Sequence, residues 1–287
     1  MELYQAMSRL AAKFFRILFT GSAFFVFWWG GLFLSWTALP AIRFRHRADP
    51  REGSRRCRSL LNRALRLHAD YMRFFGLIDF DSRGLEKKLP QGPFVLVTNH
   101  PSLIDVVLLL SACPKMFCVV KGPVMHSPFV GRMLRYADHI DAGDGGAAAG
   151  MAVLQGAVDR LRAGDPVLIF PEGTRSPRNE LGPFQKGAFA IARLAGVPVV
   201  PLHIAMSPPG LMRGMKWYTV PDGTMRYQFK VLPTCPPERW PGDSGAMAKA
   251  VRAMIAGEFP QQQPGPAAAP SPLPGRDHVA EPNERRI

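Results

Sequence analysis

The sequence predicts an α/β core preceded by a hydrophobic membrane anchor. Two observations support this prediction. Short apolar runs alternate with helical stretches between residues 94 and 204, and strands that alternate with helices are typical of α/β sheets. Before this region, residues 17–42 contain no charged side chain. With 287 residues, the chain has room for one sizeable core and for segments outside it.

The uncharged segment is long enough to cross a membrane. As one helix, residues 17–42 would rise about 39 Å, compared with about 30 Å for a hydrocarbon core. Gly30 and Gly31 divide the segment into two shorter pieces, so a re-entrant hairpin in one leaflet is an equal alternative. A cleaved signal peptide is disfavoured, because the apolar run exceeds the usual length of such a segment.

A basic block follows the anchor directly. The net charge of +14 favours an acidic partner, and the position of the arginines beside an apolar run favours an anionic membrane surface over nucleic acid. The positive-inside bias places the following domain on the cytoplasmic face of the membrane. In a bacterium this membrane would be the inner membrane. The arginines are Arg43, Arg45, Arg47, Arg51, Arg55, Arg56, Arg58, Arg63 and Arg66.

The core elements are expected in a regular order. An amphipathic helix at 51–75 leads away from the membrane. Strands follow at 94–98, 117–120, 167–170 and 199–204, with helices at 103–111, 151–162 and 187–195. The cysteines show no paired spacing, so we expect reduced structural thiols and no metal site. They are Cys57, Cys113, Cys118 and Cys235.

His100 and Asp105 are the first candidate pair for catalysis. His100 follows a predicted strand, at the edge of the sheet where ligands bind in open α/β folds. Asp105 lies about one turn into the next helix, for which Pro101 suits the first turn, and its carboxylate can reach the imidazole. Such a pair would take a proton from an alcohol near neutral pH. The alternative is a capping histidine beside an acid at a helix start.

A second polar loop follows another predicted strand, at residues 170–176. Gly173 permits close backbone approach, Arg175 offers a planar fork for phosphate or carboxylate, and Thr174 and Ser176 add donors. The loop is therefore a candidate anion site. The alternative is a polar turn in which Glu172 and Arg175 pair with each other.

These segments together resemble the glycerolipid acyltransferase family, whose best-known members are the 1-acylglycerol-3-phosphate acyltransferases. The resemblance covers roughly residues 75–205 and implies a mixed sheet flanked by helices. It implies transfer of a fatty-acyl group to a lysophospholipid hydroxyl, with 1-acylglycerol-3-phosphate as the leading acceptor and phosphatidate as the product. It rests on Asn-His-x4-Asp at 99–105, Val-Val-Lys at 119–121, Phe-Pro-Glu-Gly-Thr-Arg-Ser at 170–176 and Val-Pro-Val-Val-Pro at 197–201.

By this resemblance, His100 would be the general base and Asp105 its partner. The acceptor would be held by Glu172, Gly173 and Arg175. From the residue types, Thr174 and Lys121 join that substrate-binding set, although Lys121 is also compatible with a solvated strand end. We expect no bound cofactor, because an acyl thioester of acyl carrier protein or of coenzyme A serves as co-substrate. Other partners would be membrane lipids.

Composition and charge predict a division of the chain into three parts. Residues 1–50 would form the anchor with its basic flank, and residues 51–258 the catalytic domain. Residues 259–287, rich in Pro and Ala, have too little apolar content to fold, so we expect a disordered tail. His126, His139 and His203 are interpreted as structural.

Two departures from the family pattern concern the acceptor. Lys121 is followed by Gly-Pro-Val in place of the common x-Glu-Leu, and Ala142 stands where an arginine is usual. Arg175 and Lys121, with Lys186 as a further candidate, remain as anion ligands. A different lipid acceptor, such as a lyso-ornithine lipid, is therefore the second hypothesis. A non-catalytic module that binds anionic membranes is the third, and a hydrolase is disfavoured because no G-x-S-x-G elbow is present.

Overall fold

The computed structural model describes residues 1–143, 145–177 and 180–259, and within them seven strands form one mixed sheet. The strand order is β1-β7-β6-β2-β5-β3-β4, and every neighbouring pair is parallel except β6 with β7. The carboxyl ends of β2 to β6 therefore share one edge. The strands are β1 Ile78–Asp79, β2 Val95–Thr98, β3 Phe117–Val120, β4 Ile140–Asp141, β5 Val167–Ile169, β6 Val199–Ser207 and β7 Met225–Val231.

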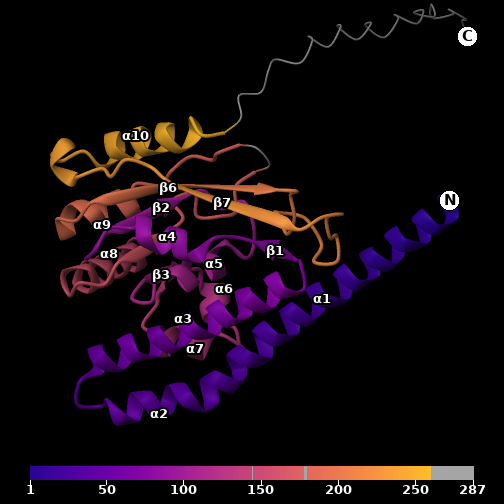
Figure 1. Cartoon of the computed structure of the whole chain (residues 1–287). Coiled ribbons are helices and arrows are strands. Elements are labelled where there is room, and N and C mark those ends of the chain that lie inside the picture. Colours follow the sequence, from indigo (N-terminus) through magenta and orange to yellow (C-terminus); the bar gives the residue numbers. More distant parts are fainter. Residues whose placement is uncertain (144, 178–179, 260–287) are drawn as a thin grey trace, which may run out of the picture.

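Helices cover both faces of the sheet, with α10 on one side and the α1–α3 segment on the other (Figure 1). Strand β2 shows how the two faces are built, because successive side chains point to opposite sides. Leu96 packs in the cluster that contains α3 and α5, whereas Val95 and Val97 pack with α8, α9 and α10. All three side chains are fully buried. The sheet is thus apolar on both faces, as expected for a mainly parallel sheet.

The helices outnumber the predicted ones. The first three are α1 Glu2–Trp36, α2 Ala38–Arg45 and α3 Pro50–Phe74, in which Asp49 caps α3 by accepting from the N–H groups of Arg51 and Glu52. The others are α4 Ser82–Lys88, α5 Asp105–Ala112, α6 Gly122–Met125, α7 Gly131–Tyr136, α8 Ala147–Arg162, α9 Gly187–Ala195, a 3-10 turn Pro237–Arg239 and α10 Ser244–Ala256.

The N-terminal helix is continuous through Gly30 and Gly31, so of the two alternatives the chain does not form a hairpin at these glycines. A Cβ atom at Gly31 would lie 3.0 Å from the Val130 side chain, so this glycine lets α1 approach α7 closely. The chain bends at Thr37 and reverses direction only between α2 and α3. The segment Met7–Arg45 is long and apolar enough to cross a membrane, judged by length and composition alone.

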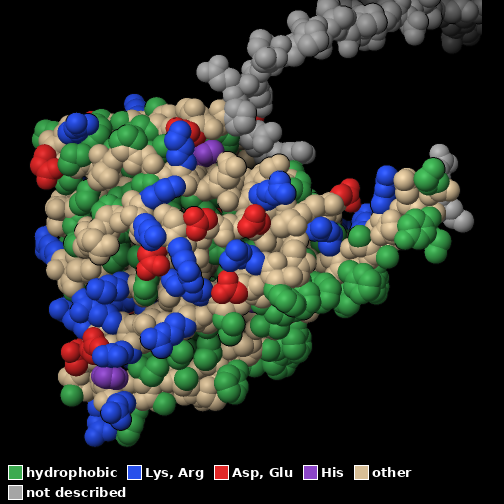
Figure 2. Space-filling view, viewed as in Figure 1, with side chains coloured by type: hydrophobic (Ala, Val, Ile, Leu, Met, Phe, Trp, Pro, Cys, Tyr) green, Lys and Arg blue, Asp and Glu red, His purple; other side chains and the backbone are tan. Residues whose placement is uncertain are grey.

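Only part of α1 packs on the rest of the chain. Phe19, Ala23 and Phe27 join the main core cluster. The opposite side of the helix is apolar and exposed, as at Phe25 and Trp29 with 61% and 52% exposure. Figure 2 shows hydrophobic side chains gathered along this helix.

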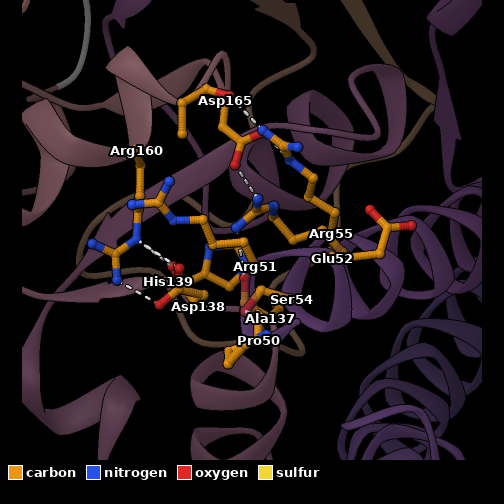
Figure 3. A network of polar contacts seen from close by, with 12 residues as sticks. Pro50, Arg51, Glu52, Ser54, Arg55, Ala137, Asp138, His139, Arg160 and Asp165 are labelled. Carbon is orange, nitrogen blue, oxygen red and sulfur yellow. Dashed lines mark hydrogen bonds and ion pairs between the residues drawn. The ribbon is translucent and has the colours of Figure 1, made fainter. Parts of the chain in front are cut away.

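A buried ion-pair network fixes α3 to two turns at the amino edge of the sheet (Figure 3). Arg58 is 3% exposed and donates to Asp165 and to the carbonyl oxygen of Ala137, the latter at 3.1 Å. Arg55 donates to the other oxygen of Asp165 at 2.9 Å. Because a buried carboxylate needs a counter-charge, these contacts tie the orientation of α3 to the turns before β4 and β5.

The expected fold class is confirmed, and the predicted elements lie close to the observed ones. The strand at 117–120 and the helix at 187–195 coincide with β3 and α9. Helix α5 begins at Asp105, two residues later than predicted, so Pro101 precedes the helix and is not in its first turn. β1, β4, β7 and α10 had no counterpart in the prediction. The predicted disordered tail lies outside the described residues except for Phe259.

Candidate active site

The site is built on the end of β2, which is clamped to β6 by one side chain. Asn99 is buried, and its amide donates to the carbonyl oxygen of Ile204 at 2.9 Å and accepts from the N–H of Ile204 at 2.8 Å. The side chain thus continues the strand pairing beyond the last backbone contact of β2. This clamp fixes the backbone immediately before His100.

His100 and Asp105 form a hydrogen-bonded pair. The Nδ1 atom of His100 lies 2.8 Å from Oδ2 of Asp105, and the same oxygen accepts from the N–H of Ser102 at 2.7 Å. The turn at 101–104 brings the two side chains together, because Asp105 is the first residue of α5. The Nε2 atom of His100 is left for a substrate, and 16% of the side chain is exposed.

The environment of Asp105 is unusual for a carboxylate, because the residue is fully buried. Burial raises the pKa of Asp105 above its ordinary value, and the hydrogen bonds from His100 and Ser102, with the charge of Arg175, oppose that rise. A carboxylate held in this way fixes the imidazole tautomer and stabilises the imidazolium. A helix-capping role alone does not require contact with the ring, so the pair favours catalysis over capping.

Phe170, which directly follows β5, limits the motion of the imidazole. Its ring stacks on the ring of His100, with centroids 4.0 Å apart and an interplanar angle of 23°. Because β2 and β5 are adjacent parallel strands, the residues that follow them meet at the same edge. The 170–176 loop and the 99–105 segment therefore form one site, as predicted from their positions after strands.

Glu172 points into the protein. It is 9% exposed, accepts from the hydroxyl of Ser176, and accepts from the N–H of Gly182 at 2.8 Å. No ion pair joins Glu172 to Arg175 among the described residues, so the alternative of a self-paired polar turn is not what the chain forms. Glu172 thus holds the loop together through its contacts with Ser176 and Gly182.

Arg175 contacts a distant segment. Its Nη1 atom donates to the carbonyl oxygens of Leu211 and Met212, both at 3.1 Å. These two residues belong to the long connection between β6 and β7. Arg175 is half-buried, and the remaining donors of its guanidinium make no hydrogen bond within the described residues, so part of the planar fork remains for an anion.

The remaining predicted residues occupy the same sheet edge. Gly173 has φ +65°, and a Cβ atom there would lie 3.0 Å from Nε2 of Gln185, so a side chain would be both strained and crowded. Thr174 is exposed. Lys121 directly follows β3 and is exposed, with no salt bridge among the described residues. Substrate contact by these residues stays a prediction.

The sequence reasoning missed two supporting residues: Phe170, which stacks on the base, and Asn99, which clamps β2 to β6. It named Ser176 as a donor in the loop but missed its contacts with His100 and Glu172, which link the two loops. All three belong to the segments that carried the family resemblance, and that position was the only available signal. Their partners lie far away along the chain, since 76 residues separate Ser176 from His100 and 105 separate Asn99 from Ile204.

The other histidines differ in environment. His139 is buried and its Nδ1 accepts from the N–H of Cys118 at 2.9 Å. Burial and the charges of Arg58 and Arg160 lower the pKa of His139 to about 3, so the ring is neutral. His203 is buried against Phe259. His126 is exposed and lies 3.6 Å from Asp141.

The chain is similar to a known protein family and to several of its members. Residues 79–205 match the family model described as Acyltransferase. The chain is 31% identical over 239 residues to 1-acyl-sn-glycerol-3-phosphate acyltransferase alpha of Mus musculus, covering 77% of this chain and 74% of that protein. It is 36% identical over 126 residues to a chloroplastic 1-acyl-sn-glycerol-3-phosphate acyltransferase of Brassica napus. That match covers 43% of this chain and spans only 36% of the Brassica protein.

A solved structure shares the fold. The crystal structure of the 1-acyl-sn-glycerophosphate acyltransferase of Thermotoga maritima aligns with a TM-score of 0.61, covering 86% of this chain and 95% of that one. The sequence identity is 22%, so this likeness concerns the fold alone.

Proposed function

The chain belongs to the acyltransferase family, and we propose that it transfers a fatty-acyl group to the 2-hydroxyl of 1-acyl-sn-glycerol-3-phosphate, giving phosphatidate. The single observation that carries this proposal is the pair of His100 and Asp105 at the carboxyl edge of the sheet, with Nδ1 engaged and Nε2 free. The names of the mouse and Brassica relatives support the acceptor.

The chemistry follows from this geometry. Nε2 of His100 takes the proton of the acceptor hydroxyl as the oxygen attacks the thioester carbonyl carbon. A tetrahedral intermediate forms, the carbon–sulfur bond breaks, and an ester bond remains. The proton passes from the imidazolium to the departing thiolate. Asp105 stabilises the imidazolium, so no protein nucleophile is required.

Arg175, Lys121 and Thr174 are the residues that we propose for the acceptor phosphate. Arg175 combines a free side of its guanidinium with a fixed position, and a bidentate contact to phosphate favours such a planar fork. Gly173 allows the loop backbone to approach the ligand. The contacts of Glu172 favour a role in shaping this loop over direct contact with the acceptor.

The acyl donor is a thioester of acyl carrier protein or of coenzyme A in this proposal. Neither is distinguished by the residues at the site. A basic surface suits both, because each carries negative charge close to its thiol arm.

We propose that α1 lies in one leaflet of the membrane and does not cross it. Its basic residues Arg9, Lys13 and Arg16 recur at helical spacing on the side opposite Phe14 and Leu18. The middle of the helix packs on the catalytic domain while its other face is apolar and exposed. A bilayer-spanning helix would lack that packed face. The cytoplasmic side is proposed because a helix in one leaflet carries no loop across the bilayer, and the anionic cytoplasmic leaflet attracts the basic block.

Ala142 favours a second candidate, which is the same reaction on another lipid hydroxyl. Ala142 follows β4 at the active-site edge, and its N–H donates to the carbonyl oxygen of Val120. It replaces the arginine expected there by family resemblance, which removes one phosphate ligand. A lyso-ornithine lipid, whose headgroup carries no phosphate, would suit this change.

The decisive experiment is acyl transfer by the purified full chain in detergent micelles. A labelled acyl thioester of each carrier is offered with 1-acyl-sn-glycerol-3-phosphate, and His100→Ala serves as the control. Labelled phosphatidate that depends on His100 supports the leading acceptor. Transfer only to a lipid from a total extract would replace that acceptor, and no transfer to any lipid would refute the reaction.

A further inference from the structure

The connection between β6 and β7, residues 208–224, is much longer than a hairpin requires, since two to five residues usually suffice. We call it the β6–β7 loop. Its inner side is fixed to the active site. Arg175 donates to the carbonyl oxygens of Leu211 and Met212, and the N–H of Leu103 donates to the same Leu211 oxygen at 3.1 Å. Leu211 and Met212 are buried.

The outer side of the loop exposes aromatic rings together with cations. Trp217 and Tyr218 are 48% and 44% exposed. The ammonium group of Lys216 lies 5.5 Å from the centre of the Tyr218 ring, and Arg213 is exposed. Amphipathic aromatic rings beside basic side chains are typical of the boundary between lipid headgroups and acyl chains.

This aromatic surface is continuous with α1. The rings of Trp217 and Phe24 are in edge contact, with centroids 6.4 Å apart. A Cβ atom at Gly21 would lie 3.2 Å from the Trp217 ring, so the indole rests directly on the helix backbone. Phe25, the neighbour of Phe24, belongs to the exposed apolar side of α1. The loop therefore widens the apolar surface of α1 towards the catalytic domain.

We propose that the β6–β7 loop is a second membrane-binding surface, carried by the catalytic domain. Trp217 and Tyr218 enter the headgroup boundary of an anionic bilayer, and Arg213 and Lys216 bind its phosphates. Two observations favour a bilayer as the partner: the continuity of the loop with α1, and the pairing of exposed aromatic rings with cations. The proposal concerns a surface, and it holds whichever acceptor is acylated.

The contact of Arg175 with the loop gives this surface a consequence for catalysis. Leu211 accepts hydrogen bonds both from Arg175 and from the backbone of Leu103, which lies in the turn between His100 and Asp105. A loop bound to headgroups therefore sets the depth of the active site relative to the bilayer. A lipid hydroxyl then reaches His100 without leaving the headgroup layer.

The depth of Trp217 can be measured in the full chain. The protein is labelled with 5-fluorotryptophan and placed in phosphatidylcholine bicelles that contain phosphatidylglycerol. Each fluorine resonance is assigned with a single Trp→Phe variant. A lipid with a nitroxide on its acyl chain is then added, because paramagnetic broadening reports distance from the lipid and does not depend on solvent exposure.

We expect the Trp217 resonance to broaden with those of Trp29 and Trp36 on α1. Trp240, near α10 on the opposite side of the sheet, is the internal control and should stay sharp. Broadening of Trp29 and Trp36 without Trp217 would overturn the loop proposal and leave the placement of α1 intact. If none of them broadened, the membrane placement of α1 would fail together with the loop proposal.

A second measurement tests the cations. The rate at which the protein leaves anionic vesicles for an excess of acceptor vesicles should rise about fivefold for each cation removed in Arg213→Gln and Lys216→Gln, because one such charge contributes about 1 kcal/mol at an anionic surface. Arg239→Gln and Lys249→Gln are matched controls near α10. Equal rates for the loop and control variants would contradict the proposal.

Discussion

His100 and Ser176 are joined by two hydrogen bonds that run in opposite directions. The N–H of His100 donates to Oγ of Ser176 at 2.8 Å, and the N–H of Ser176 donates to the carbonyl oxygen of His100, also at 2.8 Å. The hydroxyl of Ser176 in turn donates to Glu172. One small side chain therefore connects the catalytic base to the loop that follows β5.

Replacement of Ser176 by Ala should lower both stability and activity. The change leaves the His100 N–H and one oxygen of buried Glu172 without their partner, which costs about 1–3 kcal/mol for a buried group. We expect the free energy of unfolding to fall by this amount and kcat to fall as well. Both can be measured in detergent by chemical denaturation and by the transfer assay.

Thr174→Ala is the matched control for Ser176. Thr174 lies in the same loop but is exposed, so its removal should leave the free energy of unfolding within about 0.5 kcal/mol of the original. Equal losses of stability in the two variants would contradict the bridging role of Ser176.

Asp105→Asn should remove activity without unfolding the protein. Oδ2 of Asp105 contacts both Nδ1 of His100 and the N–H of Ser102, so the amide oxygen of the asparagine can take its place and keep both hydrogen bonds. The amide carries no negative charge, however, and no longer stabilises the imidazolium that forms when His100 takes the proton. We expect kcat in the transfer assay to fall about 10²- to 10⁴-fold, the usual contribution of a general base. Because burial disfavours the charged carboxylate, thermal stability should not fall.

Arg175→Ala should release the β6–β7 loop. Without the guanidinium, the carbonyl oxygens of Leu211 and Met212 lose their shared donor. We expect trypsin to cleave faster after Arg213 and Lys216, both of which are exposed. If Arg175 only bound the acceptor, the cleavage rate would stay unchanged while KM rose. Time courses followed by mass spectrometry separate the two outcomes.

Asp165→Asn should be strongly destabilising. The substitution is nearly isosteric but leaves the guanidinium of buried Arg58 without its counter-charge, which typically costs about 3–5 kcal/mol. Glu52→Gln breaks the more exposed Arg56–Glu52 pair on the same helix and should cost less than about 1 kcal/mol. Urea unfolding of both variants compares the pairs. Similar losses would mean that the buried network is not stabilising α3.

His139 should make the protein less stable in acid. Its folded pKa of about 3 lies below its ordinary value of 6.5, so the unfolded chain binds one more proton between these values. Above pH 6.5 His139 does not lower the free energy of unfolding. As the pH drops from 6.5 towards 3, this free energy falls by about 1.4 kcal/mol per pH unit. His139→Asn keeps an acceptor for the Cys118 N–H and does not titrate. Its unfolding free energy should depend less steeply on pH, and an unchanged slope would contradict this assignment.

Much of the central sheet was predictable because its strands are short apolar runs between helices. β2, β3, β5 and β6 are largely buried on both faces, so their sequences are mostly apolar. β7 was missed because exposed polar residues such as Arg226, Gln228 and Lys230 alternate along it. β1 and β4 have two residues each, which is too short for a periodic signal.

The pairing of His100 with Asp105 was also predictable, because its spacing is local. The orientations of Glu172 and Arg175 were not. Both were interpreted as facing the acceptor, but Glu172 turns inward to Gly182 and Arg175 also holds Leu211. Their partners lie in segments with no sequence pattern of their own. Long-range hydrogen bonds to loop backbones leave no trace in a single sequence.

The packing of α1 bears on how the molecule unfolds. Phe19, Ala23 and Phe27 share one cluster with Met72 of α3 and Leu108 of α5, so apolar contacts cross the boundary predicted near residue 50. Shortening the chain to residues 51–287 would uncover part of the main core. Anchor and catalytic domain should therefore unfold in a single cooperative transition. A detergent that binds the anchor should also weaken the packing of the catalytic domain.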